Sequence, residues 1–369
     1  MSALAAMSLS QTAIAAVDDE NVDNPAGTTI SGLFYGVRLD RNGPYTIDNA
    51  GEIGAELGTL PAGIDIFNSV TVTSINNTST GVIKADATSG GRGSGINAEN
   101  GSIGTLINAG LISGSAAVTF GVGIYLKTNN IETLTNSGRI LGVAADSKGT
   151  GLFASNSTIT TLTNTGTISG SAVDDDAFGL KLKTASIITL TNNGLITGSA
   201  ADRYAYGIVI TSASSVGTIT NSGIISGSAA FDAYGIDIKG SLLANSQIIN
   251  TGTGTISAFA TGGEAGKSFL GAYGISIQST ASLTTLTNEG SIEAISTVTD
   301  GRGDEAIGVY LKGSTISTLN NSGSISASAE LESGAGIYVS DESTINTLTN
   351  TGMISGAGTS KAYGIIVTK

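Results

Sequence analysis

Residues 161–170 read Thr-Leu-Thr-Asn-Thr-Gly-Thr-Ile-Ser-Gly, and close variants of this phrase return about every 28 residues along the 369-residue chain. The asparagine marks the same place in eleven successive units: Asn49, Asn77, Asn108, Asn136, Asn164, Asn192, Asn221, Asn250, Asn288, Asn321 and Asn350. A repeat of this length, rich in strand-forming residues and without helical periodicity, predicts a solenoid in which each unit adds one rung.

A second phrase, Gly-Ile-x-Ile, keeps the same period. It reads Gly-Ile-Val-Ile at 207–210 and Gly-Ile-Asp-Ile at 235–238, and its glycines fall 28 residues apart at Gly95, Gly123, Gly151, Gly179, Gly207 and Gly235. A solenoid grows by adding rungs, so its length does not count domains. We therefore expect one elongated all-β solenoid of about eleven rungs of roughly 28 residues.

The alternation within one rung predicts which side chains face inward. In residues 162–168, period-two alternation places Leu162, Asn164, Gly166 and Ile168 on the inner side and the threonines on the outer side. A buried carboxamide is costly unless it is paired, but identical asparagines stacked at the strand spacing can donate to one another. We predict a structural asparagine ladder, with the glycine two residues later allowing a close corner or a positive φ.

The aromatic residues also recur with the repeat. Alternation from Ile208 and Ile210 predicts that Tyr206 points inward with them, and four further rings occupy the equivalent place: Phe178, Tyr234, Tyr273 and Tyr363. Stacked rungs would set these rings in a file about 4.8 Å apart.

Composition excludes several classes of function. The 16 Lys and Arg against 29 Asp and Glu give a net charge of -13, which disfavours nucleic acid and anionic lipid as partners. The chain has no cysteine and no histidine, so disulfides, thiolate chemistry and histidine-activated nucleophiles are excluded. We expect no cofactor.

The first residues differ from the repeats. Residues 1–16 are small and apolar and end in Ala13-Ile14-Ala15-Ala16, which is typical of the second half of a secretory signal peptide. We predict a signal-peptide remnant at 1–16, a flexible segment at 17–30, irregular rungs forming a cap at 31–94, and the regular solenoid at 95–369.

The phrases at 163–170 and 220–227 resemble those of autotransporter passenger regions, over about Ser31 to Lys369. Such passengers are right-handed parallel β-helices exported through type V secretion. The resemblance implies a right-handed, single-stranded parallel β-helix at the bacterial cell surface, often an adhesin or a stalk. It also implies an outer-membrane barrel, encoded elsewhere or in a missing C-terminal part.

Two neighbouring rungs depart from the period. Asn250 to Asn288 spans 38 residues and Asn288 to Asn321 spans 33, so insertions are predicted at 258–272 and 298–306. Insertions on one side of a solenoid are often its binding surface. The candidate partner-binding residues are Glu264, Lys267, Phe269, Asp300, Arg302, Gly303, Asp304 and Glu305.

The second insertion contains Arg302-Gly303-Asp304, the tripeptide that integrin ligands display. The match is only three residues long. It leads to the hypothesis that this loop binds a receptor on a host cell or in its matrix.

An acidic residue recurs at the corner where the insertions arise, as Asp146, Asp174, Asp202 and Asp232. Lys148 and Arg203 are positioned in the sequence to pair with such carboxylates. A solvated acidic stripe is expected here, with bound Ca²⁺ as the alternative.

Two other functions stay open. Parallel β-helices also act on polysaccharides, and Asp174–Asp176 offers grouped carboxylates for such an enzyme. However, the chain has no His and no Trp, and few cations lie near that corner. An uncapped last rung would instead let copies of the chain stack into a fibre or a surface-layer subunit. A non-catalytic adhesin or display stalk is the function that the sequence favours.

Overall fold

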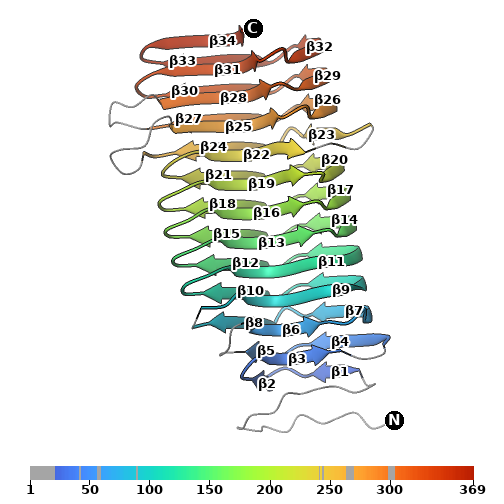
Figure 1. The fold of residues 1–369 in the computed structure, drawn as a ribbon. Coiled ribbons are helices and arrows are strands. Elements are labelled where there is room, and N and C mark those ends of the chain that lie inside the picture. The colour runs from blue at the N-terminus through green and yellow to red at the C-terminus, as the bar shows by residue number, and fades with distance from the viewer. Residues whose placement is uncertain are drawn as a thin grey trace.

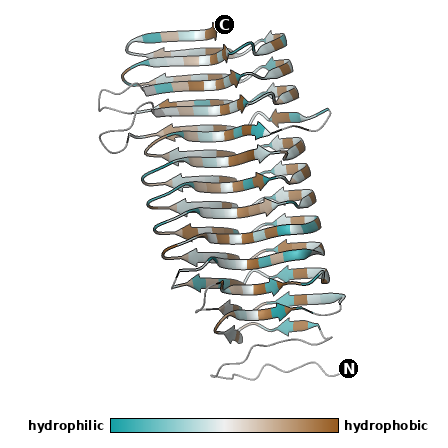
Figure 2. Cartoon of the chain, viewed as in Figure 1, coloured by the Kyte–Doolittle hydropathy of each residue, from teal (hydrophilic) through white to brown (hydrophobic). Residues whose placement is uncertain are grey.

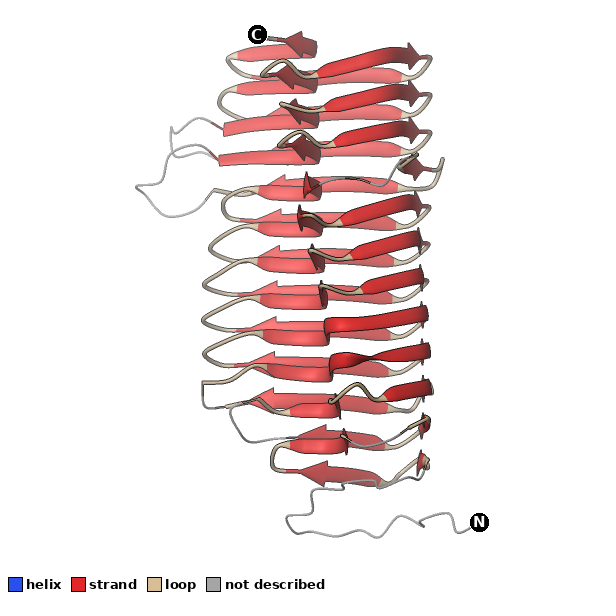
Figure 3. Cartoon of the chain, turned by 45° about the vertical axis from the view of Figure 1, so that its right-hand side comes forward, coloured by secondary structure: helices blue, strands red, loops and turns tan. Residues whose placement is uncertain are grey.

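The computed structural model describes residues 21–40, 43–55, 60–88, 90–240, 242, 245–262, 270–297 and 304–369. All regular structure in these ranges is β-strand, and they contain no helix (Figure 3). The strands stack into a column of parallel coils that starts near the N-terminus and finishes at the C-terminus (Figure 1). The predicted all-β parallel β-helix is confirmed.

Each coil has three strands, which form three faces of the column. The first face is made of strands that end at a repeated asparagine: β1 (Val22–Asn24), β4 (Tyr45–Asn49), β7 (Thr71–Asn77), β14 (Thr158–Asn164), β17 (Ser186–Asn192), β20 (Ser215–Asn221), β23 (Gln247–Asn250), β26 (Ser282–Asn288), β29 (Thr315–Asn321) and β32 (Thr344–Asn350).

The second face is a separate sheet of twelve parallel strands, one for each coil. Its members are β2 (Thr29–Gly32), β5 (Glu52–Ala55), β8 (Val82–Ala87), β10 (Leu111–Ala116), β12 (Arg139–Ala144), β15 (Thr167–Ala172), β18 (Leu195–Ala200), β21 (Ile224–Ala229), β24 (Thr255–Ala260), β27 (Ser291–Ser296), β30 (Ser324–Ala329) and β33 (Met353–Gly358).

The third face carries the Gly-Ile-x-Ile phrases. It comprises β3 (Tyr35–Leu39), β6 (Ala62–Ile66), β13 (Gly149–Ser155), β16 (Ala177–Lys183), β19 (Ala205–Ser212), β22 (Ala233–Gly240), β25 (Leu270–Gln278), β28 (Asp304–Lys312), β31 (Ser333–Ser340) and β34 (Lys361–Val367). Two longer strands, β9 (Gly93–Asn108) and β11 (Gly121–Asn136), continue from the third face into the first.

The pairing register follows the sequence period. Asn136 pairs with Asn164, and Asn164 pairs with Asn192, each 28 residues on. The twelve coils are separated by eleven steps, which at about 4.8 Å a step gives a column roughly 50 Å long. Equivalent residues of successive units therefore lie above one another, as the period predicts.

The interior is filled by aliphatic side chains from all three faces. Leu162, Ile168 and Leu180 are fully buried, and their equivalents in neighbouring coils belong to the same hydrophobic cluster. Hydrophobic residues recur at similar places in successive strands (Figure 2). Complete burial of one such side chain contributes about 1.5–3 kcal/mol, so the stacked aliphatic residues are the main source of stability.

The asparagine ladder is confirmed and is longer than the sequence predicted. Each Nδ2 donates to the Oδ1 of the asparagine in the next coil at 2.7–2.8 Å, from Asn24 to Asn350. Each also donates to backbone carbonyls at the same corner; Asn136, for example, donates to Gly138 and Thr167. The buried amides are therefore paired, as their complete burial requires.

The first coil corrects the prediction for residues 21–30; the rest of the segment 17–30 and the predicted signal-peptide remnant at 1–16 lie outside the described residues. Strands β1 and β2 include residues of this segment, which we had expected to be flexible, and pair with β4 and β5. Asn24 enters the ladder by donating to Asn49 and accepts a hydrogen bond from the Thr28 hydroxyl. The sequence obscured this coil because Pro25 follows Asn24 and only 25 residues separate Asn24 from Asn49.

Glycines are needed where backbones approach closely. A Cβ on Gly179 would lie 2.6 Å from the carbonyl oxygen of Gly207 and 2.8 Å from Cγ2 of Ile196 on the second face. Gly166 would meet the carbonyl oxygen of Gly138. Gly166 has no positive φ, so close approach alone explains this glycine. Gly252, two residues after Asn250, is an exception, because nothing lies within 4 Å of its added Cβ.

Four of the five predicted rings form the aromatic file, whereas Tyr363 is separated from Tyr273 by Ile307 and Ala335. The prediction that the file points inward was wrong. Tyr206 groups with Val209, whereas Ile208 and Ile210 on either side of Val209 belong to the interior cluster. Gly207 faces Ile225 of the second face, so two consecutive residues, Gly207 and Ile208, point inward and the alternation shifts by one. The rings therefore stack on the outer surface of the third face.

Candidate functional site

The two insertions leave adjacent coils at the same corner, between the second and third faces. In the first of these coils, β24 continues to Ala260 and β25 begins at Leu270; in the next, β27 continues to Ser296 and β28 begins at Asp304. Leu270 pairs with Asp304 where the two strands begin. The extra residues are thus fewer than the predicted 258–272 and 298–306, because the ends of those ranges pair with neighbouring strands.

Most of the predicted partner-binding residues lie outside the described residues: Glu264, Lys267, Phe269, Asp300, Arg302 and Gly303. Asp304 opens strand β28. Glu305 follows it and is half-buried beside Tyr273. The structure therefore locates the base of each insertion and brings the two bases together.

A group of polar contacts holds the base of the first insertion. The backbone N–H of Gly271 donates to Asp232 Oδ1 at 2.9 Å, and the Tyr234 hydroxyl donates to Asp232 Oδ2 at 3.3 Å. The hydroxyl of Tyr273 donates to Glu305 Oε2 at 3.3 Å, which joins the first insertion-bearing coil to the second. Three successive coils are thus linked at this corner, first through Asp232 and the Gly271 backbone and then through Tyr273 and Glu305.

Burial shapes the electrostatics of this group. It raises the pKa of Asp232 to about 6, although the hydrogen bonds from Gly271 and Tyr234 favour the charged form. Burial likewise raises the pKa of Glu305, and the hydrogen bond from Tyr273 opposes that rise. Both carboxyl groups accept hydrogen bonds from neighbouring donors, and these contacts hold the bases of the insertions in place.

The aromatic file ends beside these contacts. The ring centroids of Phe178 and Tyr206 are 5.1 Å apart, those of Tyr206 and Tyr234 are 4.9 Å apart, and those of Tyr234 and Tyr273 are 5.0 Å apart. The planes differ by 5–12°, so the rings lie face to face along the column axis.

Charged side chains cover the file. Lys181 Nζ lies 3.8 Å from the centroid of Phe178, and burial lowers the pKa of Lys181 to about 8. Asp237 is completely buried, and its Oδ2 lies 2.8 Å from Lys239 Nζ, which also lies over the rings of Tyr206 and Tyr234. Burial raises the pKa of Asp237, and its pairing with Lys239 counters this effect.

At the corner with the recurring aspartates, two of the adjacent carboxylates at 174–176 form ion pairs with cations. Lys148 Nζ lies 2.6 Å from Asp176 Oδ2, and Arg203 Nη1 lies 3.7 Å from Asp175 Oδ1. These are the two cations that the sequence suggested, although their partners are Asp175 and Asp176. Among the residues that the structure describes, no group of three or more Asp or Glu is placed to hold a metal ion.

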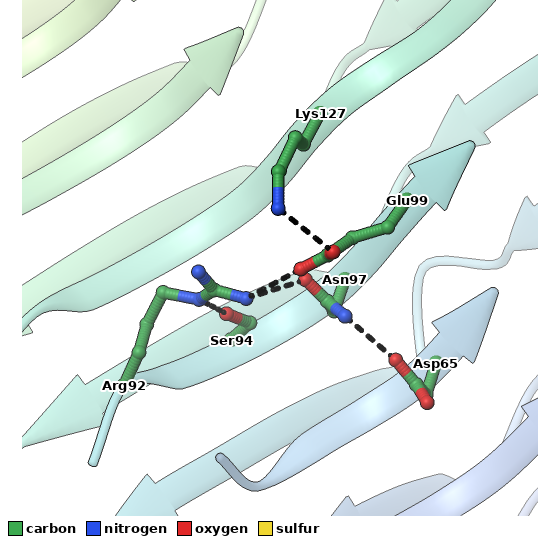
Figure 4. A network of polar contacts seen from close by, with 6 residues as sticks. All are labelled: Asp65, Arg92, Ser94, Asn97, Glu99 and Lys127. Atoms are coloured by element: carbon green, nitrogen blue, oxygen red, sulfur yellow. Dashed lines mark hydrogen bonds and ion pairs between the residues drawn. The ribbon is translucent and has the colours of Figure 1, made fainter. Parts of the chain in front are cut away.

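A further polar network, which the sequence did not reveal, covers the third face near its N-terminal end (Figure 4). Arg92 donates to Ser94 and Asn97 and pairs with Glu99, which also pairs with Lys127. Asn97 donates to Asp65 in the coil below at 2.6 Å. The network spans β6, β9 and β11 and pairs its own charges, so it joins these coils to one another.

The sequence contained little indication of the contacts at the bases of the insertions. The long-range contact of Asp232 with Gly271 joins residues 39 apart, across a coil of irregular length. The recurring aspartate at this corner was the one available signal for it, since Asp232 belongs to that set.

Comparison of the chain with protein-family models, curated proteins and solved structures found no match. Among the described residues, no helix is long and apolar enough to cross a membrane.

Proposed function

We propose that this chain is a secreted bacterial cell-surface β-helix, of the autotransporter passenger type, that acts as a non-catalytic adhesin or display stalk. Its stacked coils would form a rigid column, and the two insertions would carry the contact with a receptor on a host cell or in its matrix. The proposal assigns no cofactor and no nucleic acid partner.

The observation that carries this proposal is the pairing of Leu270 with Asp304 at the starts of β25 and β28. It brings the exits of both insertions to one corner of the column. The contacts of Asp232 with Gly271 and of Tyr273 with Glu305 hold those exits to neighbouring coils. A solenoid whose variable segments share one corner is well suited to binding through them.

A deletion experiment tests the proposal. Residues 261–269 and 297–303 would be shortened to the length of the equivalent turn at 230–232, and attachment of the purified protein to cultured host cells would be measured against the intact chain. We expect the shortened chain to lose most of its attachment while its melting temperature changes little, because loops contribute little to stability. Equal attachment by both chains would contradict a role for the insertions.

A single substitution tests the integrin hypothesis. Asp304→Glu keeps the charge but lengthens the side chain of the Arg302-Gly303-Asp304 tripeptide, and it should abolish any integrin-dependent attachment. Attachment equal to that of the unmodified chain would remove the integrin hypothesis and leave the rest of the adhesin proposal intact.

A further inference from the structure

The outer surface of the first face carries two parallel rows of threonines. The first row contains Thr105, Thr133, Thr161, Thr189 and Thr218, which pair in register through five consecutive coils. Two residues further along the same strands, the second row contains Thr135, Thr163, Thr191 and Thr220. We call these two rows the threonine array.

The array resumes beyond one interruption. Gln247 and Ile249 occupy the two positions in β23, after which the rows continue with Thr285 and Thr287, Thr318 and Asn320, and Thr347 and Thr349. The pattern is therefore a Thr-x-Thr unit repeated along most of the column, on the right-hand side in Figure 1.

The hydroxyl groups of the array form a regular two-dimensional lattice. Neighbouring coils separate the threonines of one row by about 4.8 Å, and two residues of extended strand separate the rows by about 6.6 Å. The asparagine ladder and the aliphatic interior fix both spacings, because every coil pairs in register with the next.

These hydroxyl groups are free to bind water. Within the described residues, none of the array hydroxyls has a hydrogen-bond partner in the protein. The array hydroxyls do not pair with one another either, although some stacked hydroxyls outside the array do, as Thr344 donates to Thr315 at 3.2 Å. Each hydroxyl therefore needs a water molecule, and the waters must repeat with the coils.

Most of the face that carries the array is also uncharged, although Glu132 on β11 is exposed next to Thr133. Strands β14, β17, β20, β23, β26, β29 and β32 contain no Asp, Glu, Lys or Arg, although the whole chain carries a net charge of -13. A soluble ligand needs a concave site with converging polar groups, which a strip of repeated threonines lacks. The occupant that fits a periodic, uncharged hydroxyl surface is itself periodic.

We propose that the threonine array binds the surface of ice. Water oxygens on the prism faces of an ice crystal repeat in two directions, at distances close to the spacing between coils and to the spacing between rows. Array hydroxyls can complete hydrogen bonds to such a layer, while the threonine methyl groups occupy the spaces between its water molecules. This activity is independent of the insertions and of the adhesin proposal.

A paired-variant experiment tests the proposal with the intact chain. Thr163→Tyr with Thr191→Tyr places two bulky, strand-compatible side chains on the array. The matched control, Ser171→Tyr with Ser199→Tyr, makes the same change at paired positions on the second face. The fraction of protein incorporated into slowly growing ice and the thermal hysteresis of the solution are measured for all three proteins.

We expect the unmodified chain and the control to enter ice and to produce thermal hysteresis, and the array variant to lose both by severalfold. Exclusion of the unmodified chain from ice, to the extent seen for an ordinary globular protein, would overturn the proposal. Equal ice incorporation by all three proteins would also overturn it, as would binding of the unmodified chain to crystalline cellulose without binding to ice.

If the tyrosine pair lowers the melting temperature, a second pair decides the question. Thr163→Val with Thr191→Val keeps the shape and the β-branching of the side chains but removes two array hydroxyls. Reduced thermal hysteresis at an unchanged melting temperature would support the proposal, and unchanged thermal hysteresis would overturn it.

Discussion

Asn136 Nδ2 donates to Asn164 Oδ1 at 2.7 Å, and both side chains are completely buried. Asn164 repeats the contact by donating to Asn192. An amide placed among aliphatic side chains is tolerated here because each coil supplies the partner for the next. The ladder also fixes the register, since a slip by one residue would leave every amide in it unpaired.

Loss of one ladder amide should destabilise the protein strongly. Asn164→Ala removes the acceptor of Asn136 and the donor to Asn192, and we expect it to lower the free energy of unfolding by about 2–4 kcal/mol. Chemical denaturation measures this change. Thr160→Ala, at an exposed position in the same strand, serves as the control and should have a small effect. A similar small effect of Asn164→Ala would contradict the ladder's role.

Adding a methyl group at Gly179 should also lower the stability of the protein. Gly179→Ala brings a Cβ against the carbonyl oxygen of Gly207 and against Ile196, so the two faces must move apart. We expect a loss of roughly 1–3 kcal/mol, as overpacking of an interior usually causes. Gly252→Ala is the control, because nothing lies within 4 Å of its added Cβ. Equal melting temperatures for the two variants would show that the faces are not in close contact at Gly179.

The contribution of Tyr206 to stability should come from its ring more than from its hydroxyl. Tyr206 stacks between Phe178 and Tyr234. Tyr206→Phe keeps the ring and should be nearly neutral, whereas Tyr206→Ala should cost about 3–5 kcal/mol. Thermal unfolding followed by near-ultraviolet circular dichroism measures both. If Tyr206→Ala proved as stable as Tyr206→Phe, the file would not contribute to stability.

The raised carboxyl pKa values predict greater stability in mild acid. Asp232 has a pKa of about 6 in the folded protein, above its ordinary value of 3.8, so between these values the folded state binds more protons than the unfolded state. Stability should therefore rise as the pH falls from 7.5 to 5. Asp232→Asn should remove about 1–2 kcal/mol of this dependence.

Melting temperatures across this pH range provide the test for Asp232. Glu132→Gln, which changes an exposed carboxylate on β11, is the control and should leave the pH dependence unchanged. A melting temperature that falls steadily from pH 7.5 to 5 would contradict the predicted sign.

The sequence predicted the features that repeat. The 28-residue period and the asparagines gave the stacking, the register and the ladder, because an identical residue in every coil has an identical environment. It failed where the period is interrupted. Asn24 was missed because Pro25 follows it, and Tyr206 was placed on the wrong side because Gly207 and Ile208 both face inward.

Contacts between residues that do not repeat also could not be predicted from the sequence. The hydrogen bond from Gly271 to Asp232 depends on which coils become neighbours across an insertion. The charge pairing of Arg92 with Glu99 depends on the directions of two side chains that are seven residues apart. Neither interaction repeats from coil to coil, so periodicity carries no information about it.

The most direct test of the account is a series of distances along the column. Because the chain has no cysteine, single cysteines can be introduced for spin labelling. One label would be placed at Asn346, and the other in turn at Glu132, Thr160 or Ile188. These residues occupy equivalent positions in β32, β11, β14 and β17. Pulsed electron–electron double resonance should give separations of roughly 34, 29 and 24 Å, decreasing by about 4.8 Å for each coil. Separations that do not shorten by one constant step for every 28 residues would contradict the stacked-coil structure.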